Sequence, residues 1–199
     1  MRIVLFTAFI VLFYSSSAYA SSEVQELKVY VENLIDKGYE IFNDQTLSDT
    51  ERTDKSRQLI RSHLHLDWMA KHTLGRHRRV ISKNKIAEFS KIYSQFVVKA
   101  YTDLSTSYNG EKAVLKKIRQ INDDMFIVNT EILRPGGQLP IKVDYLVHKI
   151  ENGIEDIYLI GDIITEGISI LNSQQAEFNS VISSRGIDGL ITDLQSRTK

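Results

Sequence analysis

Histidines are the side chains of this chain whose types and spacing first suggest chemistry. Four of the five histidines lie close together, with Asp67 as the nearest carboxylate: His63, His65, His72 and His77. The His63-x-His65 pair could chelate a metal ion from an extended segment, whereas His72 and His77 are five residues apart and do not share a helical face. Zinc sites need three or four protein ligands, so this set is incomplete. The sequence therefore predicts no metal site and no metal cofactor.

Two aspartates on neighbouring predicted strands form a possible acid pair. Asp144 and Asp162 could perform general acid–base chemistry only if their surroundings perturbed their ionisation. In the alternation of the strand around Asp144, this residue shares a face with Lys142 and His148, away from the apolar side chains. We therefore expect both aspartates to be solvated carboxylates.

Sequence signatures of familiar enzymes are missing. The chain of 199 residues contains no cysteine, and therefore neither a thiol nucleophile nor a disulfide. It also has no G-x-S-x-G elbow, Walker loop, G-x-G-x-x-G turn or H-E-x-x-H helix. The sequence predicts that the protein is not an enzyme and names no catalytic residue.

Positive charge gathers in one segment although the whole chain is balanced, with 25 basic and 25 acidic residues. Between Trp68 and Ala87 there is no acid, and there are six basic residues: Lys71, Arg76, Arg78, Arg79, Lys83 and Lys85. Such a stretch is either an ordinary solvated face or a contact for phosphate headgroups or an acidic partner. As the functional hypothesis we assign partner docking to Arg76, Arg78, Arg79 and Lys83. No nucleic-acid-binding module is recognisable, and we expect no nucleic-acid partner.

The N-terminus has the pattern of a secretory signal peptide. Arg2 precedes the apolar run Ile3–Tyr14, and Ala18-Tyr19-Ala20 forms a small-residue cleavage site before Ser21. The run is too short to span a bilayer comfortably, although an uncleaved anchor is the alternative. The sequence predicts a leader at residues 1–20 and a single domain at residues 21–199. An exported chain without cysteines suits a bacterial periplasm.

The first half of the chain has helical periodicity. Apolar residues from Val24 to Phe42 recur every three or four positions, and Ser48 with Glu51 forms a capping box for a second helix. A short helix should end at Gly75, and Ser82 should begin a long helix that ends at Asn109-Gly110.

The second half has the period of strands. Predicted strands cover Val114–Ile121, Phe126–Leu133, Ile141–His148 and Ile154–Thr165. A helix that ends at Gly186 follows them, and a short helix from about Asp188 to Leu194 closes the chain. This order predicts an α+β fold, with N-terminal helices and a C-terminal helix packed on a curved four-stranded antiparallel sheet. Such a sheet can enclose an apolar cavity against the long helix.

Two apolar faces are candidates for the wall of that cavity. The strands contribute Val128, Ile132, Val143, Tyr145, Val147 and Ile163, and the long helix contributes Phe89, Tyr93, Phe96 and Val97. Stripes of this kind are also typical of an ordinary hydrophobic core, and the alternative stays open at this point.

Several short segments, in this order and spacing, resemble the MlaC family of periplasmic phospholipid-binding proteins, also called toluene-tolerance auxiliary proteins. The matching segments are Leu66-Asp67-x-Met69-Ala70-x-x-x-Leu74-Gly75, Phe89…Phe96…Tyr101, Val143-Asp144-Tyr145, Gly161-Asp162-Ile163 to Glu166-Gly167-Ile168-Ser169-Ile170-Leu171 with Phe178, and Gly186-Ile187-Asp188-Gly189-Leu190. The chain has Arg78 where the family often has an aromatic residue, and Gln174-Gln175 where it often has Tyr-Arg.

The resemblance implies a lipid shuttle that carries phospholipid between outer- and inner-membrane complexes and maintains the lipid asymmetry of the outer membrane. Its implied partners are an inner-membrane ABC complex with a membrane-anchored substrate-binding subunit and an outer-membrane lipoprotein–porin complex. Phospholipid is cargo, and no other cofactor is implied. With the two apolar faces, Trp68, Met69 and Leu74 of the first segment complete the set of residues that we expect to bind lipid.

A two-tailed lipid requires a dry cavity of roughly 1,000 Å³, at the upper end of common pocket sizes. Two other functions remain as alternatives. One is an enzyme of the same cone-like shape, with Asp144, Asp162 or His148 in a pocket, and the other is an adaptor without a ligand.

Overall fold

The computed structural model describes residues 16–153 and 156–198. Helices come first: α1 (Ser16–Asn43), α2 (Asp49–His63), α3 (Leu66–Thr73), the short 3₁₀ turn η1 (Gly75–Arg79) and α4 (Lys83–Ser105). The strands are β1 (Lys112–Asn122), β2 (Met125–Leu133), β3 (Ile141–Glu151), β4 (Asp156–Thr165) and β5 (Ile168–Ser169), with the turn η2 (Pro135–Gly137) before β3 and α5 (Ile170–Arg197) at the end. The predicted α+β class is confirmed.

The sheet is antiparallel and follows the order β1-β2-β3-β4-β5. Four of these strands were predicted, and the fifth is a two-residue strand that pairs with the end of β4. It follows a tight turn in which Glu166 and Gly167 both have positive φ, 49° and 82°. Two residues are too few to show a periodicity, so the sequence did not reveal this strand. Irregular pairing between β1 and β2 and between β3 and β4 bends the sheet.

Local signals set most helix ends. Ser48 and Glu51 form the predicted capping box of α2, and the Ser82 hydroxyl accepts a hydrogen bond from the Lys85 amide at the start of α4. Gly186, with φ of 70°, interrupts α5 where the sequence placed a break. However, α4 ends at Ser105, earlier than expected, and the Ser105 and Thr106 hydroxyls donate to main-chain carbonyls in its last turn.

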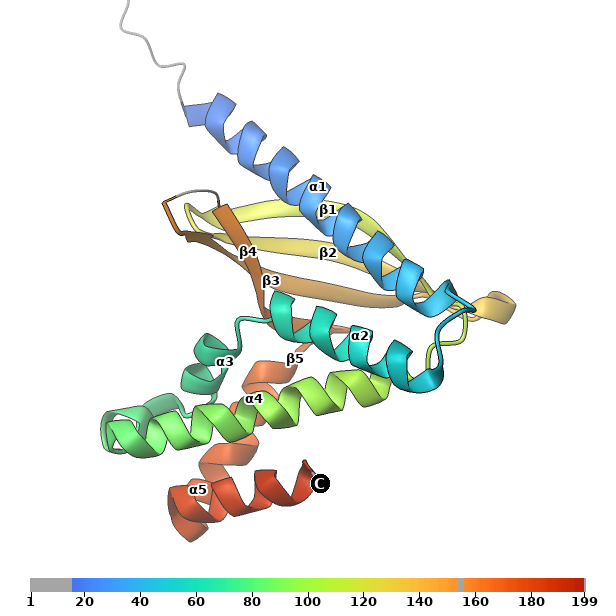
Figure 1. Cartoon of the computed structure of the whole chain (residues 1–199). Helices are drawn as coiled ribbons and strands as arrows, with labels where there is room; N and C mark the ends of the chain where they lie inside the picture. The colour runs from blue at the N-terminus through green and yellow to red at the C-terminus, as the bar shows by residue number, and fades with distance from the viewer. Residues whose placement is uncertain (1–15, 154–155, 199) are drawn as a thin grey trace, which may run out of the picture.

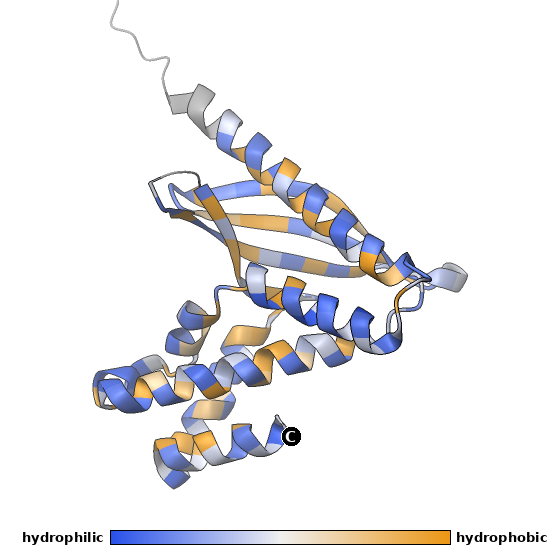
Figure 2. Ribbon diagram, viewed as in Figure 1, coloured by the Kyte–Doolittle hydropathy of each residue, from blue (hydrophilic) through white to orange (hydrophobic). Residues whose placement is uncertain are grey.

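The molecule has two hydrophobic cores, and both contact β4. Helix α1 crosses the sheet, whereas α3, α4 and α5 gather in a separate helical layer (Figure 1). One core joins α3, α4 and α5, and the other joins α1 to the strands. The partly buried Ile160 of β4 packs against both cores. Apolar residues alternate with polar ones along the strands and mark one stripe on several helices (Figure 2).

The predicted leader lies mainly outside the described residues, since the described chain begins at Ser16 within α1. None of the helices described by the structure combines the length and apolar character that a membrane span requires.

Candidate functional site

An apolar cavity of about 290 Å³ lies between α1 and the sheet. Nearly all of the side chains in its walls are aliphatic or aromatic. The lining residues are Tyr30, Val31, Leu34, Ile35, Gly38, Tyr39, Phe42, Tyr108, Glu111, Ala113, Val128, Thr130, Ile132, Tyr145, Val147 and Ile160.

Two periodicities build these walls. On α1 the lining residues recur at three- and four-residue intervals, which brings them onto one helical face. On β2, Val128, Thr130 and Ile132 are two residues apart and so point to the same side of the sheet. Tyr145 pairs directly with Val128 across the strands and extends the same surface.

Several polar atoms of the wall have hydrogen-bond partners in the protein. The Tyr30 hydroxyl donates to the Tyr158 carbonyl at 2.6 Å, and the Thr130 hydroxyl donates to the Val143 carbonyl at 2.8 Å. Tyr39 Oη accepts a hydrogen bond from the Ala113 amide. Burial raises the pKa of Tyr30 to about 12, so its hydroxyl stays neutral and protonated. The cavity is therefore dry in character, because few polar groups are free to bind water inside it.

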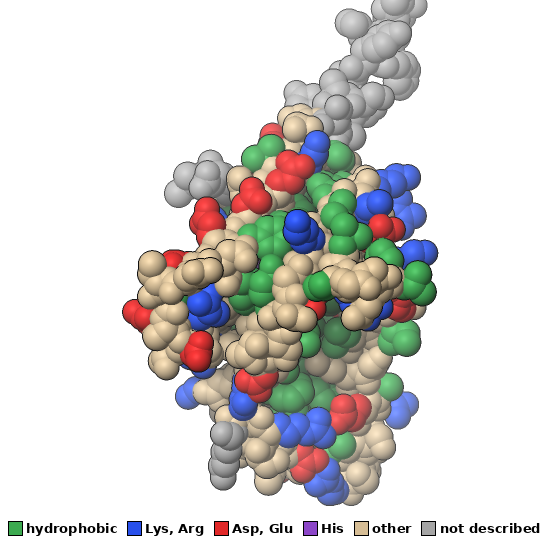
Figure 3. All heavy atoms as spheres, turned by 90° about the vertical axis from the view of Figure 1, so that its right-hand side faces the viewer, with side chains coloured by type: hydrophobic (Ala, Val, Ile, Leu, Met, Phe, Trp, Pro, Cys, Tyr) green, Lys and Arg blue, Asp and Glu red, His purple; other side chains and the backbone are tan. Residues whose placement is uncertain are grey.

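Glu111 is the charged side chain in the wall of the cavity. Among the described residues that line it, Glu111 is the only ionisable acid or base with a formal charge at neutral pH, and its carboxylate accepts from the Asn109 amide at 2.7 Å. Phe42 and Tyr108 stack nearby with ring centroids 4.6 Å apart. Figure 3 views the molecule from the right-hand side of Figure 1, and hydrophobic side chains are visible there between polar ones.

A second, more polar cavity of about 310 Å³ shares Phe42 with the first. Arg52 lies in its wall and donates to main-chain carbonyls at the C-terminal end of α1, including Phe42 O at 2.8 Å and Asp44 O at 2.8 Å. These charge-assisted hydrogen bonds hold the end of α1 against α2.

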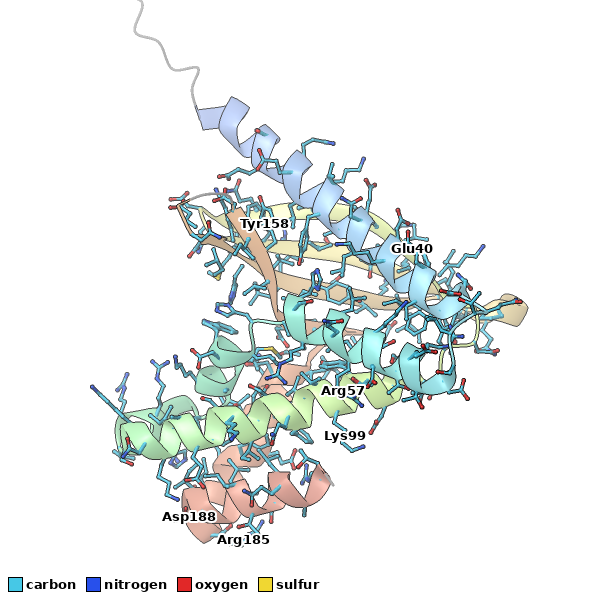
Figure 4. All side chains as sticks on the ribbon, viewed as in Figure 1. Glu40, Arg57, Lys99, Tyr158, Arg185 and Asp188 are labelled. Carbon is cyan, nitrogen blue, oxygen red and sulfur yellow. The ribbon has the colours of Figure 1, made fainter. Side chains whose placement is uncertain are left out.

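The other end of α1 is held by a partly buried lysine of the sheet. Lys149 Nζ lies 2.7 Å from a Glu23 carboxylate oxygen and 2.9 Å from an Asp156 carboxylate oxygen. These ion pairs raise the pKa of Lys149, which therefore keeps its charge. In the same region Tyr158 projects from β4 toward α1 (Figure 4). Helix α1 is thus tied to the rest of the molecule at both ends of the cavity.

The strand residues predicted to face a cavity divide into two groups. Val128, Ile132, Tyr145 and Val147 line it. Val143 is buried on the same sheet face but outside the lining, and Ile163 pairs directly with Tyr145 there. The alternation thus placed these residues on one sheet face, and their binding of lipid stays a prediction.

The helical residues predicted to bind lipid lie elsewhere. Met69, Leu74, Phe89, Tyr93 and Val97 are buried in the core between α3, α4 and α5, and Trp68 and Phe96 pack against it. Phe89 and Tyr93 contact Phe178 edge-on, with ring centroids 6.1 and 6.2 Å apart. The stripe on the long helix is ordinary core, the alternative left open by the sequence, and the expectation that this helix faces the cavity is wrong.

Helix α1 supplies the wall that we assigned to α4. The helical spacing of Val31, Ile35 and Phe42 was already visible, but it gave no sign of which sheet face these residues would cover. Gly38, a lining residue, has no atom within 4 Å of where a Cβ would stand. Only its place on the same helical face as Leu34 and Ile35 could have indicated its role.

Asp162 does not fit its predicted role. It is 6% exposed, and its carboxylate accepts hydrogen bonds from the Ser169 hydroxyl at 2.6 Å and from the Leu171 amide at 3.0 Å. It therefore joins β4 to the first turn of α5, and the expectation of a solvated carboxylate is wrong. Asp144 accepts from the Asn129 side chain at 2.7 Å and is partly exposed.

The histidines form a contact between layers. His65 Nδ1 and His148 Nδ1 are 2.8 Å apart, and the Trp68 ring meets the His148 ring edge-on at 4.4 Å. Within the described residues, no three histidine, cysteine or acidic side chains are grouped as metal ligands would be. Neither His148 nor the two aspartates contribute to the lining of the two cavities.

The two glutamines that depart from the resembled pattern both join helices. Gln174 Oε1 accepts a hydrogen bond from the Tyr93 hydroxyl at 2.7 Å, and Gln175 Nε2 donates to the His72 carbonyl at 2.7 Å. They link α5 to α4 and α3 within the helical layer.

Comparison with known proteins gives consistent results. The model of the family described as "MlaC protein" matches residues 32–196. A binding protein of an intermembrane phospholipid transport system, MlaC of Haemophilus influenzae, is 23% identical over 134 residues, which are 67% of this chain and 62% of that protein. The match thus spans less than two thirds of that relative.

A solved structure has a similar fold. The phospholipid-binding protein from Ralstonia solanacearum, determined in complex with a phospholipid, superposes with a TM-score of 0.69 at 20% sequence identity. The alignment covers 84% of this chain and 94% of that one.

Proposed function

Because this chain belongs to the MlaC family, we propose that it is a phospholipid-binding shuttle that carries lipid between membrane complexes and so maintains the lipid asymmetry of the outer membrane. The observation that carries the proposal is the apolar cavity between α1 and the sheet. Acyl chains make no hydrogen bonds, and a wall whose polar atoms are already partnered suits them. The printed description of the H. influenzae relative supports the same function.

The tails lie along Val128, Ile132, Tyr145 and Val147 on the sheet and under Leu34 of α1. These residues share one surface, and burying a methylene group there gains about 0.8 kcal/mol. The headgroup stays outside the apolar section, since a phosphate inside it would lose its hydration without compensation.

The cavity is smaller than the roughly 1,000 Å³ expected for both tails of a phospholipid. At about 290 Å³ it accepts part of the tails, and α1 must move away from the sheet to admit the remainder. The contacts that limit such movement are the ion pair of Lys149 with Glu23, the hydrogen bonds of Tyr30 and Tyr39 to the strands, and those of Arg52. Release of one end would widen the cavity and leave the other end attached.

The cellular setting follows from the same family. The protein works in the periplasm, receiving and delivering phospholipid at an inner-membrane ABC complex with its anchored substrate-binding subunit and at an outer-membrane lipoprotein–porin complex. The leader at residues 1–20 directs export and is removed after Ala20. N-terminal sequencing of the exported protein should begin at Ser21, and a chain that still begins at Met1 would contradict a released shuttle.

The enzymatic alternative lacks support from the site. Asp162 is engaged by three donors, and His148 is enclosed by Trp68 and His65, so neither is available to a substrate in the cavity. The cavity lining among the described residues has no pair of acid and base within it.

Bound lipid is the direct test of the proposed function. The protein purified from a bacterial envelope should release glycerophospholipid on organic extraction, identified by mass spectrometry. Extracts without phospholipid, from protein that is folded by circular dichroism, would favour an adaptor without a ligand.

A further inference from the structure

The connection between α3 and α4 forms a charged projection at the end of the helical layer. Arg76, Arg78, Arg79, Val80 and Lys83, here called the basic tip, are all exposed, and Val80 is 83% exposed. Figure 1 places the connection at one extremity of the molecule, and side chains with nitrogen ends extend outward from it in Figure 4.

The positive charge of the basic tip is not compensated by neighbours. The other two basic residues of the segment form ion pairs: Lys71 contacts Asp67, and Lys85 contacts Glu88 at 2.9 Å and Asp188 at 2.6 Å. Among the described residues, no ion pair engages the four cations of the tip: Arg76, Arg78, Arg79 and Lys83. Four positive charges therefore stand together with no acid bound to them.

Neighbouring residues anchor this projection firmly. Leu74 is fully buried in the helical core, Ile81 packs against the same core, and Gly75 turns the chain with φ of 51° beside the Gln175 side chain. The chain between Leu74 and Ile81 is thus held at both ends, and the side chains of Arg76, Arg78, Arg79 and Val80 within it are exposed to solvent. Folding does not require Val80 to be apolar, because its side chain packs into neither core.

We propose that the basic tip binds the surface of a membrane that contains anionic phospholipid. The four cations match phosphate groups, and Val80 can enter the boundary between headgroups and acyl chains. A lipid surface fits better than an acidic protein, since stable protein interfaces involve about 20–30 residues a side and the tip offers five. The inference rests on the proposed function, because a shuttle must reach the membranes it serves.

The basic tip and the cavity are separate. No residue of the tip lines the cavity, which lies in the other hydrophobic unit of the molecule, between α1 and the sheet. The tip would therefore tether the protein at a membrane while leaving its cargo in place. Membrane binding and lipid occupancy can be measured independently.

The test is flotation of the purified protein with vesicles of phosphatidylcholine, with and without phosphatidylglycerol, at low and physiological ionic strength. The wild type should float with the anionic vesicles only, and less at higher salt. A variant with Arg76→Gln, Arg78→Gln, Arg79→Gln and Lys83→Gln should bind at least roughly a hundredfold more weakly at low salt, because each of the four cations strengthens binding to an anionic surface by about fivefold. Val80→Ser should weaken binding by a smaller factor and at both salt concentrations.

The matched control removes the same charge from the exposed side of the sheet, with Lys112→Gln, Lys117→Gln, Arg119→Gln and Lys142→Gln. This control should bind vesicles within about twofold of the wild type if location matters more than net charge. Equal weakening of both variants would overturn the proposal, as would a wild type that does not float. Loss of binding to an acidic envelope protein, without any vesicle binding, would assign the tip to a protein partner instead.

Phospholipid extracted from each variant separates this inference from the proposed function. The tip variant should retain the cargo of the wild type. Wild-type protein without cargo would contradict the shuttle itself, whatever the vesicles show.

Discussion

At the scale of single residues, the contact between His65, the N-cap residue of α3, and His148 of β3 responds to pH. His65 and His148 share one hydrogen bond of 2.8 Å, in which one ring donates and the other accepts. The His148 ring lies against Gly161, where an added Cβ would be 2.7 Å from its Cε1 atom. Burial of the ring, and after it the charge of His65, lower the pKa of His148 to about 4. The negative charge of Asp124 opposes this shift. His72 also disfavours the charged form.

The pH dependence of stability follows from that shift. The unfolded chain binds a proton at His148 near pH 6.5, whereas the folded chain resists protonation down to about pH 4. The contribution of His148 to the free energy of unfolding is therefore fully present above pH 6.5, and it declines as the pH falls from 6.5 toward 4. Burial also lowers the pKa of His65, which adds in the same direction.

Urea unfolding at several pH values measures this effect. His148→Phe keeps a ring in place but removes the proton-binding group and the hydrogen bond to His65. The variant should lose about 1 kcal/mol at neutral pH and show a shallower decline of stability on acidification. An unchanged slope would contradict the role given to His148.

At the scale of elements, one carboxylate connects the sheet to the last helix. Asp162 accepts from the Ile163 amide, the Leu171 amide and the Ser169 hydroxyl, and Ser169 in turn caps α5 through the Asn172 amide. This network fixes the direction in which α5 leaves β4. It also explains how a carboxylate can be buried at this position, since its oxygens accept hydrogen bonds there.

Loss of this connection should be costly. Asp162→Ala leaves buried donors without an acceptor and should lower the free energy of unfolding by about 2–4 kcal/mol, as measured by urea unfolding. Asp144→Ala is the control, because Asp144 is partly exposed and accepts one side-chain hydrogen bond, and it should cost less than about 1 kcal/mol. Similar losses in the two variants would contradict the network.

Element by element, the sequence predicted what depends on neighbours along the chain. The capping box at Ser48, the cap at Ser82, the alternation of β2 and β3 and the break at Gly186 are all present. The stripe on α4 shows the limit of that reasoning. Periodicity identifies which face of a helix is apolar, but the partner that covers this face depends on the tertiary arrangement.

At the scale of the whole molecule, the core of α3, α4 and α5 and the core between α1 and the sheet differ in how they are filled. The helical unit is filled by the aromatic rings of Phe89, Tyr93 and Phe178 and leaves α5 tied to α4. The unit of α1 and the sheet leaves an apolar cavity between them, although α1 is attached to its neighbours at both ends. The sequence predicted the sheet side of this cavity and missed its helical side, since α1 and α4 have equally amphipathic patterns.

The central claim is that the cavity between α1 and the sheet holds phospholipid, and lipid occupancy in two tryptophan variants of α1 tests it most directly. Leu34→Trp adds bulk inside the cavity, whereas Val29→Trp adds it on the same helix at a position that is 48% exposed. Phospholipid per protein, from organic extraction and mass spectrometry, should fall severalfold in Leu34→Trp and stay at the wild-type level in Val29→Trp. Equal occupancy in both variants and the wild type, with Leu34→Trp still folded, would contradict the claim.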